Sequence, residues 1–256
     1  MATMTAPLAP WSLAGESLVG LARCPERLAP VPWGLQPLPG PALIVATCFS
    51  ESPVGPYLEF TVAEPARLGM RVSWCVSTMV VDSPESRVGG RLNWGFPKEL
   101  GALTWRRDGS QRELHWVERD IVVRGRPGGP PLPVLAPVRM LQRRGDGPVV
   151  VPGRLYGRAR LATIEVQTPE GDPLAPLAGG HPGVHVAGMR LRVRPARHPV
   201  GLASTLRAPL RAPEPALSWE ARGDWLSGRA LPSHGRGHWF DPSIAHGKSA
   251  GQSVVR

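Results

Sequence analysis

A lysine in an otherwise arginine-rich chain is the residue best suited to do chemistry. Of the 30 basic residues only two are lysines, Lys98 and Lys248. Arginine stays protonated and is a poor nucleophile, whereas a lysine shielded from water loses its proton more readily and attacks carbonyl groups. Lys98 lies in NWGFPKELG, beside aromatic residues that would shield it, while Lys248 lies in the Gly- and Ser-flanked segment AHGKSAGQSVVR. We therefore take Lys98 as the candidate nucleophile.

A glutamate in the segment SPVGPYLEFTV supplies the acid–base group that such a lysine needs. Strand alternation would place Tyr57, Glu59 and Thr61 on one face, so that Glu59 points either to solvent or into a pocket. An amine with a carboxyl group nearby is the minimum for imine chemistry. The amine adds to a ketone, the carboxyl group transfers protons, and the protonated imine accepts electrons from a breaking C–C bond.

At these residues the sequence resembles the acetoacetate decarboxylase family. The residues that carry the resemblance are Gly55, Tyr57 and Glu59 in GPYLE, and Gly90, Arg91 and the run GFPK (95–98) in GRLNWGFPK. A weaker similarity extends it over roughly residues 14–196. The resemblance implies a cone-shaped β-barrel, Lys98 as the Schiff-base lysine and Glu59 as the proton-transfer group. It also implies an oligomer that needs no cofactor.

Three departures from the family pattern affect the expected reaction. The family has a second lysine directly after the first, and here that residue is Glu99. Its carboxylate would favour the charged amine if it lay near Lys98, but neighbouring residues of a strand point to opposite faces. A second family glutamate falls near Ile44, and the arginine that binds the substrate carboxylate falls near Gly15. Both groups are therefore missing from the expected site.

These departures leave several functions open. The leading hypothesis is a lyase that decarboxylates a 3-oxo acid through an imine on Lys98, with Glu59 as acid–base group. Arg91, Tyr57 and Phe96 are the candidate substrate-binding residues, although Arg91 would also serve as a structural ion-pair partner. The alternatives are a Schiff-base aldolase, dehydratase or hydratase acting on another oxo acid, and a non-catalytic barrel that binds a small acid.

The composition argues against several other classes of protein. The net charge of +10 is carried by scattered arginines without a binding motif or an aromatic platform, so we expect no nucleic-acid partner. No apolar run is long enough to span a membrane, and the N-terminal residues do not look like a secretory signal. Cys24, Cys48 and Cys75 form no CxxC pair and indicate reduced, mostly buried thiols in a cytoplasmic protein. The pairs His181/His185 and His234/His238 are too glycine-broken to predict a metal site.

Alternating apolar and polar residues predict a mainly β fold, an α+β chain with few short helices around antiparallel strands. The predicted strands are 17–23, 42–49, 57–62, 70–82, 113–124, 154–167 and 184–194, with a bulge at Ala187-Gly188. Residues 63–69 read as a short helix, and the Pro/Gly-rich segment 125–137 as a loop or crossing segment. The expected division is an N-terminal extension (1–13), the barrel domain (14–199) and a partly disordered Pro/Gly-rich tail (200–256).

Overall fold

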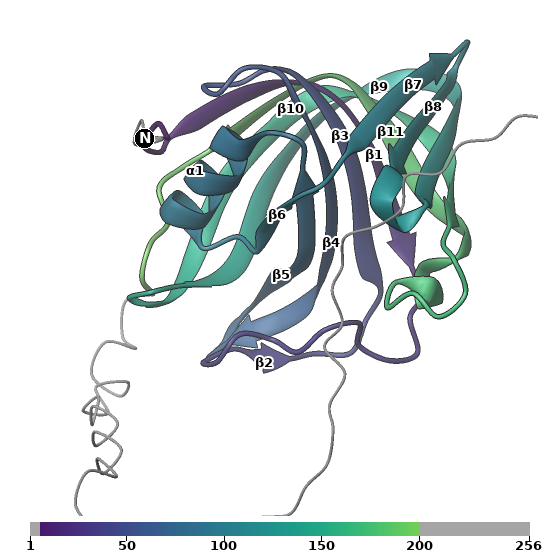
Figure 1. Ribbon diagram of the computed structural model, residues 1–256. Helices are drawn as coiled ribbons and strands as arrows, with labels where there is room; N and C mark the ends of the chain where they lie inside the picture. The colour runs from purple at the N-terminus through teal and green to yellow at the C-terminus, as the bar shows by residue number, and fades with distance from the viewer. Residues whose placement is uncertain (1–5, 200–256) are drawn as a thin grey trace, which may run out of the picture. The chain divides into compact units, whose positions relative to one another are not determined.

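The computed structural model describes residues 6–199, so the predicted tail, Lys248 and the pair His234/His238 lie outside the described residues. The strands are β1 (Trp11–Ala22), β2 (Gln36–Pro37), β3 (Ala42–Glu51), β4 (Tyr57–Leu68), β5 (Arg71–Val81), β6 (Lys98–Leu100), β7 (Leu103–Asp108), β8 (Gln111–Trp116), β9 (Ile121–Arg144), β10 (Gly147–Gln167) and β11 (Gly179–Val193). A single α-helix of this part, α1 (Pro84–Trp94), precedes β6 (Figure 1), and two short 3-10 helices cover Val117–Arg119 and Ala175–Leu177.

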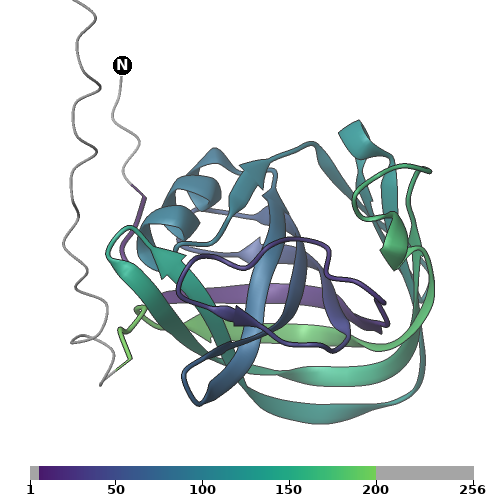
Figure 2. The same cartoon turned by 90° about the horizontal axis from the view of Figure 1, so that it is seen from below.

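The eleven strands of residues 6–199 form one large curved sheet in the order β6-β5-β4-β3-β1-β11-β10-β9-β8-β7, with β2 beside β4. Most neighbours are antiparallel, but β5 is parallel to β6 and also to β9. The second of these contacts, Trp74–Cys75 against Met140–Leu141, brings the sheet round on itself. Figure 2 shows this curvature, with the N-terminal strand beside β11. The predicted mainly β class is confirmed, as a curved sheet rather than a regular cone.

Two predicted features of the sheet are wrong in detail. Residues 63–69, expected to be helical, continue strand β4 to Leu68. The segment 125–137, expected to be a loop or crossing segment, is the middle of the long strand β9. The predicted bulge at Ala187-Gly188 is confirmed, because the pairing with β1 skips from Met189 to Val186 and Gly188 has a φ of +56°. The first strand begins at Trp11, inside the segment expected to be an N-terminal extension.

The two faces of the strands β1, β3 and β4 serve different purposes. One face, which includes Leu18, Ile44 and Phe60, is fully buried against β8, β9 and the end of β10. The opposite face, which includes Tyr57, lies in a second apolar cluster with Trp11 and residues of β10 and β11. The period of two along each strand thus sends alternate side chains into two separate cores. The second core surrounds the cavity described below.

Two further properties follow from the described residues. No helix within residues 6–199 is long and apolar enough to cross a membrane. All three cysteines are free thiols, as predicted, but only Cys75 is buried, whereas Cys24 and Cys48 are partly exposed. Burial raises the pKa of the Cys75 thiol to about 11, with smaller effects from Arg27 and Glu64.

Candidate active site

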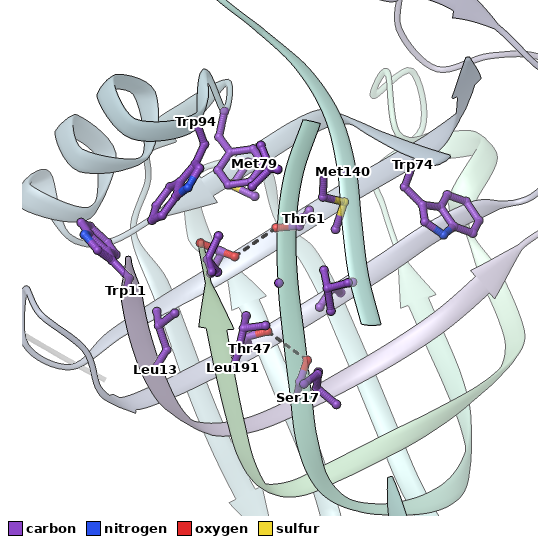
Figure 3. Close-up of a pocket in the computed structure, with 18 of the residues that line it drawn as sticks. Trp11, Leu13, Ser17, Thr47, Thr61, Trp74, Met79, Trp94, Met140 and Leu191 are labelled. Atoms are coloured by element: carbon purple, nitrogen blue, oxygen red, sulfur yellow. Dashed lines mark hydrogen bonds between the residues drawn. The ribbon is translucent and has the colours of Figure 1, made fainter. Parts of the chain in front are cut away.

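A cavity of about 280 Å³ lies within the curved sheet (Figure 3). Its walls come from β1, β3, β4 and β5 and from the facing strands β9, β10 and β11. Trp11 and Trp94 lie together at one side in Figure 3, and Trp74 lies at the opposite side. The cavity contains the ends of two polar side chains that the sequence singled out, Lys98 and Glu59.

Lys98 is buried, with 3% of its side chain exposed, and its ammonium group meets oxygen atoms on two sides. Nζ donates to Glu59 Oε2 at 2.8 Å and to Ser86 Oγ at 2.9 Å. Nζ also lies 5.1 Å from the centre of the Tyr57 ring, within the range of a cation–π contact. A proton therefore has a direct path from the amine to the Glu59 carboxylate.

Glycines on helix α1 make room for the buried lysine. The helix begins after Ser83, whose Oγ accepts a hydrogen bond from the Ser86 amide at 3.0 Å. A Cβ atom on Gly90 would lie 2.5 Å from Lys98 Cδ, and one on Gly89 would lie 2.4 Å from the Trp11 ring. Only residues without a side chain allow α1 to pack this closely on the lysine stem and on Trp11.

The end of the helix also positions Lys98. Gly95 has a φ of +70°, the left-handed conformation that ends helices, and its amide donates to the Arg91 carbonyl at 3.0 Å. The chain then runs through Phe96 and Pro97 into β6, which pairs Lys98 with Met79 of β5. Because side chains alternate along β6, Lys98 points into the cavity and the next residue, Glu99, is exposed.

Glu59 and Tyr57 reach the cavity from the same face of β4, as the alternation predicts. Glu59 accepts from Lys98 with Oε2 and from the Thr61 hydroxyl with Oε1, at 3.4 Å. Tyr57 is buried, and burial together with the charge of Glu59 raises the pKa of its hydroxyl well above the usual value. Tyr57 therefore stays neutral and contributes an aromatic wall rather than a base.

Several aromatic rings line the cavity that holds the amine. Trp94 packs edge-on against Trp11, with ring centres 5.1 Å apart, and against Phe96 at 5.8 Å. Phe49 packs against Tyr57 at 4.8 Å. The rings help to bury the Lys98 side chain, which is 3% exposed. They also fix the cavity's shape, because aromatic side chains have few rotatable bonds. A buried amine, a carboxylate at hydrogen-bond distance and an adjoining cavity can together form and hydrolyse an imine.

The family model described as acetoacetate decarboxylase (ADC) matches residues 26–121 of the chain. Over these residues the chain is similar to the acetoacetate decarboxylase family. The matched segment includes every residue that the sequence pointed to as a candidate, from Tyr57 to Lys98. The resemblance stated from the GPYLE and GRLNWGFPK segments is thus confirmed. No curated protein sequence matches the chain.

Solved structures share the fold of the described part of the chain. A structure from structural studies of acetoacetate decarboxylase has a TM-score of 0.59 and 17% identity, covering 75% of this chain and 90% of that chain. The acetoacetate decarboxylase of Legionella pneumophila has a TM-score of 0.56 and 17% identity, covering 75% of this chain and 88% of that chain. The enduracididine biosynthesis enzyme MppR, complexed with pyruvate, has a TM-score of 0.58 and 16% identity, covering 77% of this chain and 91% of that chain. At such identities the likeness establishes the fold alone.

The predicted substrate-binding residues of the domain occupy different places. Tyr57 and Phe96 line the cavity. Arg91 does not: its side chain is exposed, and its Nε donates to the backbone carbonyl of Lys98 at 2.6 Å. Arg91 thus holds the strand that carries the lysine. The arginine that does border the cavity is Arg139 on β9, which is exposed and which the sequence analysis did not select.

At Gly15 and Ile44, where the family has charged residues, the structure leaves no suitable place for a charged side chain. A Cβ atom at Gly15 would lie 2.0 Å from the Cys48 carbonyl oxygen, so no side chain fits there without moving the backbone. Ile44 is fully buried in the first core, beside Phe60 and Val62, where an unpaired carboxylate would be costly. Neither position offers the cavity a charge.

Sequence reasoning missed the hydroxyl groups of the site. Ser86 is fully buried and contacts Nζ, but SPESRVGG reads as a turn-rich segment in which no single serine stands out. Ser17 and Thr47 line the cavity on β1 and β3 and share a hydrogen bond of 2.9 Å (Figure 3). Thr47 pairs directly with Glu59 in the register of β3 and β4, and this register is visible only in the structure.

Proposed function

We propose that the protein is a Schiff-base lyase that decarboxylates a 3-oxo acid, with Lys98 as nucleophile and Glu59 as proton carrier. The observation that carries the proposal is the ion pair between buried Lys98 and partly buried Glu59, 2.8 Å apart, in the lining of a mostly apolar cavity. The family assignment of the domain supports it as well.

The reaction begins when Glu59 accepts a proton from the Lys98 ammonium group. The neutral amine then attacks the ketone carbon of the substrate, forming a carbinolamine whose hydroxyl group leaves as water after Glu59 returns the proton. The resulting protonated imine is an electron sink. The bond between the α-carbon and the carboxylate breaks, CO2 leaves, and its bonding electron pair forms an enamine on the lysine nitrogen.

The enamine carbon then takes up a proton that comes from solvent, and water hydrolyses the imine to release the ketone and the free amine. The site has features that would favour the bond-breaking step. The carboxylate carries a full charge that disappears as CO2 forms, so surrounding it with apolar side chains destabilises the starting state more than the transition state. Ser86 and the Tyr57 ring hold Nζ in place throughout.

A second candidate function is an aldolase, dehydratase or hydratase reaction through the same imine. With an oxo acid that carries no carboxylate on the carbon α to the ketone, such as pyruvate, loss of a proton from that carbon of the imine gives an enamine that attacks an aldehyde. MppR, which has this fold, has also been solved with the condensation product of pyruvate and imidazole 4-carboxaldehyde, at a TM-score of 0.55 and 16% identity. The reaction products distinguish this function from decarboxylation.

The test is reduction by borohydride in the presence of acetoacetate or pyruvate, followed by peptide mass mapping. We expect a substrate-dependent adduct on Lys98, and none on this peptide in Lys98→Arg, which keeps the positive charge beside Glu59. Released CO2 identifies a decarboxylase, and a condensation product identifies an aldolase. If no oxo acid gives an adduct, the remaining hypothesis is a barrel that binds a small acid without reacting.

A further inference from the structure

The lining of the cavity points to the substrate's chemical class. Most of the lining side chains are apolar, and they come from every strand that faces the cavity. Apart from Arg139 and Tyr57, the polar side chains of the lining form two groups: Lys98, Glu59 and Thr61, and the hydroxyl pair Ser17–Thr47. The reacting end of a substrate would lie at the first place, and the rest of it against apolar walls.

The charges available to a bound substrate are few among the described residues. Lys98, Glu59 and Arg139 are the charged residues of the lining, and the first two neutralise each other. Arg139 lies between Val138 and Met140 on β9 and is itself exposed. Since Met140 points into the cavity in Figure 3, alternation along β9 directs the Arg139 side chain to the other face. No buried arginine of residues 6–199 lines the cavity to bind a small acid by its carboxylate.

The size of the cavity also indicates a substrate with a larger apolar group than that of acetoacetate. Its volume of about 280 Å³ approaches the roughly 300–1,000 Å³ typical of pockets that hold drug-sized ligands. Acetoacetate has only one methyl group beyond its ketone and would leave most of the apolar wall without a partner. Each additional methylene group buried against that wall favours binding by about fourfold.

We propose that the preferred substrate is a 3-oxo acid with an extended apolar group, either an aryl-alkyl group or a chain of about five carbons beyond the ketone. This inference rests on the proposed function, because it assumes that the ketone carbon reacts with Lys98. Affinity comes from the apolar group, which packs against Leu13, Met140 and Leu191, and the carboxylate is left unpaired. The same arrangement favours loss of CO2.

The experiment compares borohydride trapping on Lys98 with acetoacetate, 3-oxooctanoate and 5-phenyl-3-oxopentanoate. We expect the two larger acids to reach half-saturation at concentrations at least tenfold lower than acetoacetate. Equal or weaker trapping of the larger acids would overturn the substrate class and leave the proposed function intact. No adduct with any of the three acids would overturn the proposed function, and the substrate class with it.

A pair of variants on β9 tests whether the cavity is the source of the preference. Met140→Trp places a larger side chain in the cavity, and we expect it to reduce the preference ratio of 3-oxooctanoate over acetoacetate to threefold or less. Leu135→Trp makes the same kind of change on the same strand at an exposed residue outside the lining, and the ratio should stay at its wild-type value. An unchanged ratio in Met140→Trp would contradict the proposal.

Discussion

At the scale of single residues, the site depends on a few atoms around one amine. The sequence indicated Lys98 because lysine is so rare in this chain, and Glu59 because alternation along β4 separates it from Phe60. It gave no indication of Ser86, because a buried serine in a turn-rich segment looks like any other. It also suggested Arg91 as a substrate ligand, whereas its guanidinium is used to hold the Lys98 carbonyl. The type of a residue was predictable, but the direction of a long side chain was not.

Replacing Glu59 with glutamine tests its role as proton carrier. Glutamine keeps the shape and can still accept a hydrogen bond from Nζ, but it cannot take up the proton. Positioned acid–base groups contribute about 10²- to 10⁴-fold to rate. We expect Glu59→Gln to slow the trapping of acetoacetate on Lys98 by at least a factor of about 100. The measurement is the time course of borohydride trapping.

Glu99→Gln is the matched control for this variant. It makes the same chemical change one residue from Lys98, at an exposed side chain on the opposite face of β6. The trapping rate should change less than about twofold, because an exposed charge is strongly screened by water. Equal losses of rate in the two variants would mean that Glu59 acts only through the general field of the site.

At the scale of secondary structure, the shorter strands were more predictable than helix α1 or the longest strand, β9. Period-two patterning identified the strand that carries Glu59. Helix α1 was not predicted, because a segment with two adjacent glycines, a proline and serines has low helix propensity. Its glycines are explained only by the tertiary contacts with Trp11 and Lys98. The proline-rich part of β9 was misread for a related reason: residues 126–139 pair with β10 alone, and an edge of this kind tolerates proline.

The contact between Gly90 and Lys98 is open to a direct test. Gly90→Ala improves the intrinsic helix propensity by about 1 kcal/mol but places a methyl group where the lysine stem lies. We expect the variant to stay folded and to lose at least about 90% of its imine trapping, since a displacement near 1 Å can cost about 100-fold in rate. Circular dichroism and trapping on the same sample separate the two effects. Full trapping by a folded Gly90→Ala protein would show that the lysine stem has room to move.

At the scale of the whole described domain, a buried ionic cluster fastens the β7–β8 hairpin to the sheet. Glu16 of β1, beside the bulge in β11, is only 8% exposed. Its carboxylate accepts from Trp105 at 3.1 Å, Arg107 at 2.6 Å, Arg112 at 2.9 Å and His185 at 2.9 Å. These donors come from β7, β8 and β11, so one carboxylate joins three strands to a fourth. None of these residues lines the cavity that holds Lys98, and we assign the cluster a structural role.

This cluster predicts a pH dependence of stability. Burial acts to raise the pKa of Glu16, but the hydrogen bonds from His185, Arg112 and Arg107 outweigh it and hold the pKa well below the usual range. A carboxyl group whose pKa is lowered on folding stabilises the folded state fully above its unfolded value, near 4.5, and progressively less as the pH falls toward the folded value. We therefore expect Glu16→Gln to lower the free energy of unfolding by about 3 kcal/mol at pH 7. The loss should shrink at pH 3.5.

Urea unfolding of the wild type and of Glu16→Gln at the two pH values measures this difference. Glu26→Gln, at an exposed glutamate, is the control and should change stability by less than about 0.5 kcal/mol at either pH. A difference for Glu16→Gln that stays constant from pH 7 to pH 3.5 would contradict the electrostatic origin, since a packing defect does not titrate. Imine trapping at pH 7 should survive in whatever fraction of Glu16→Gln remains folded, because the cluster contributes no side chain to the Lys98 pocket. The ionic cluster that stabilises the sheet is thus separate from the Lys98–Glu59 pair for which we propose a reaction.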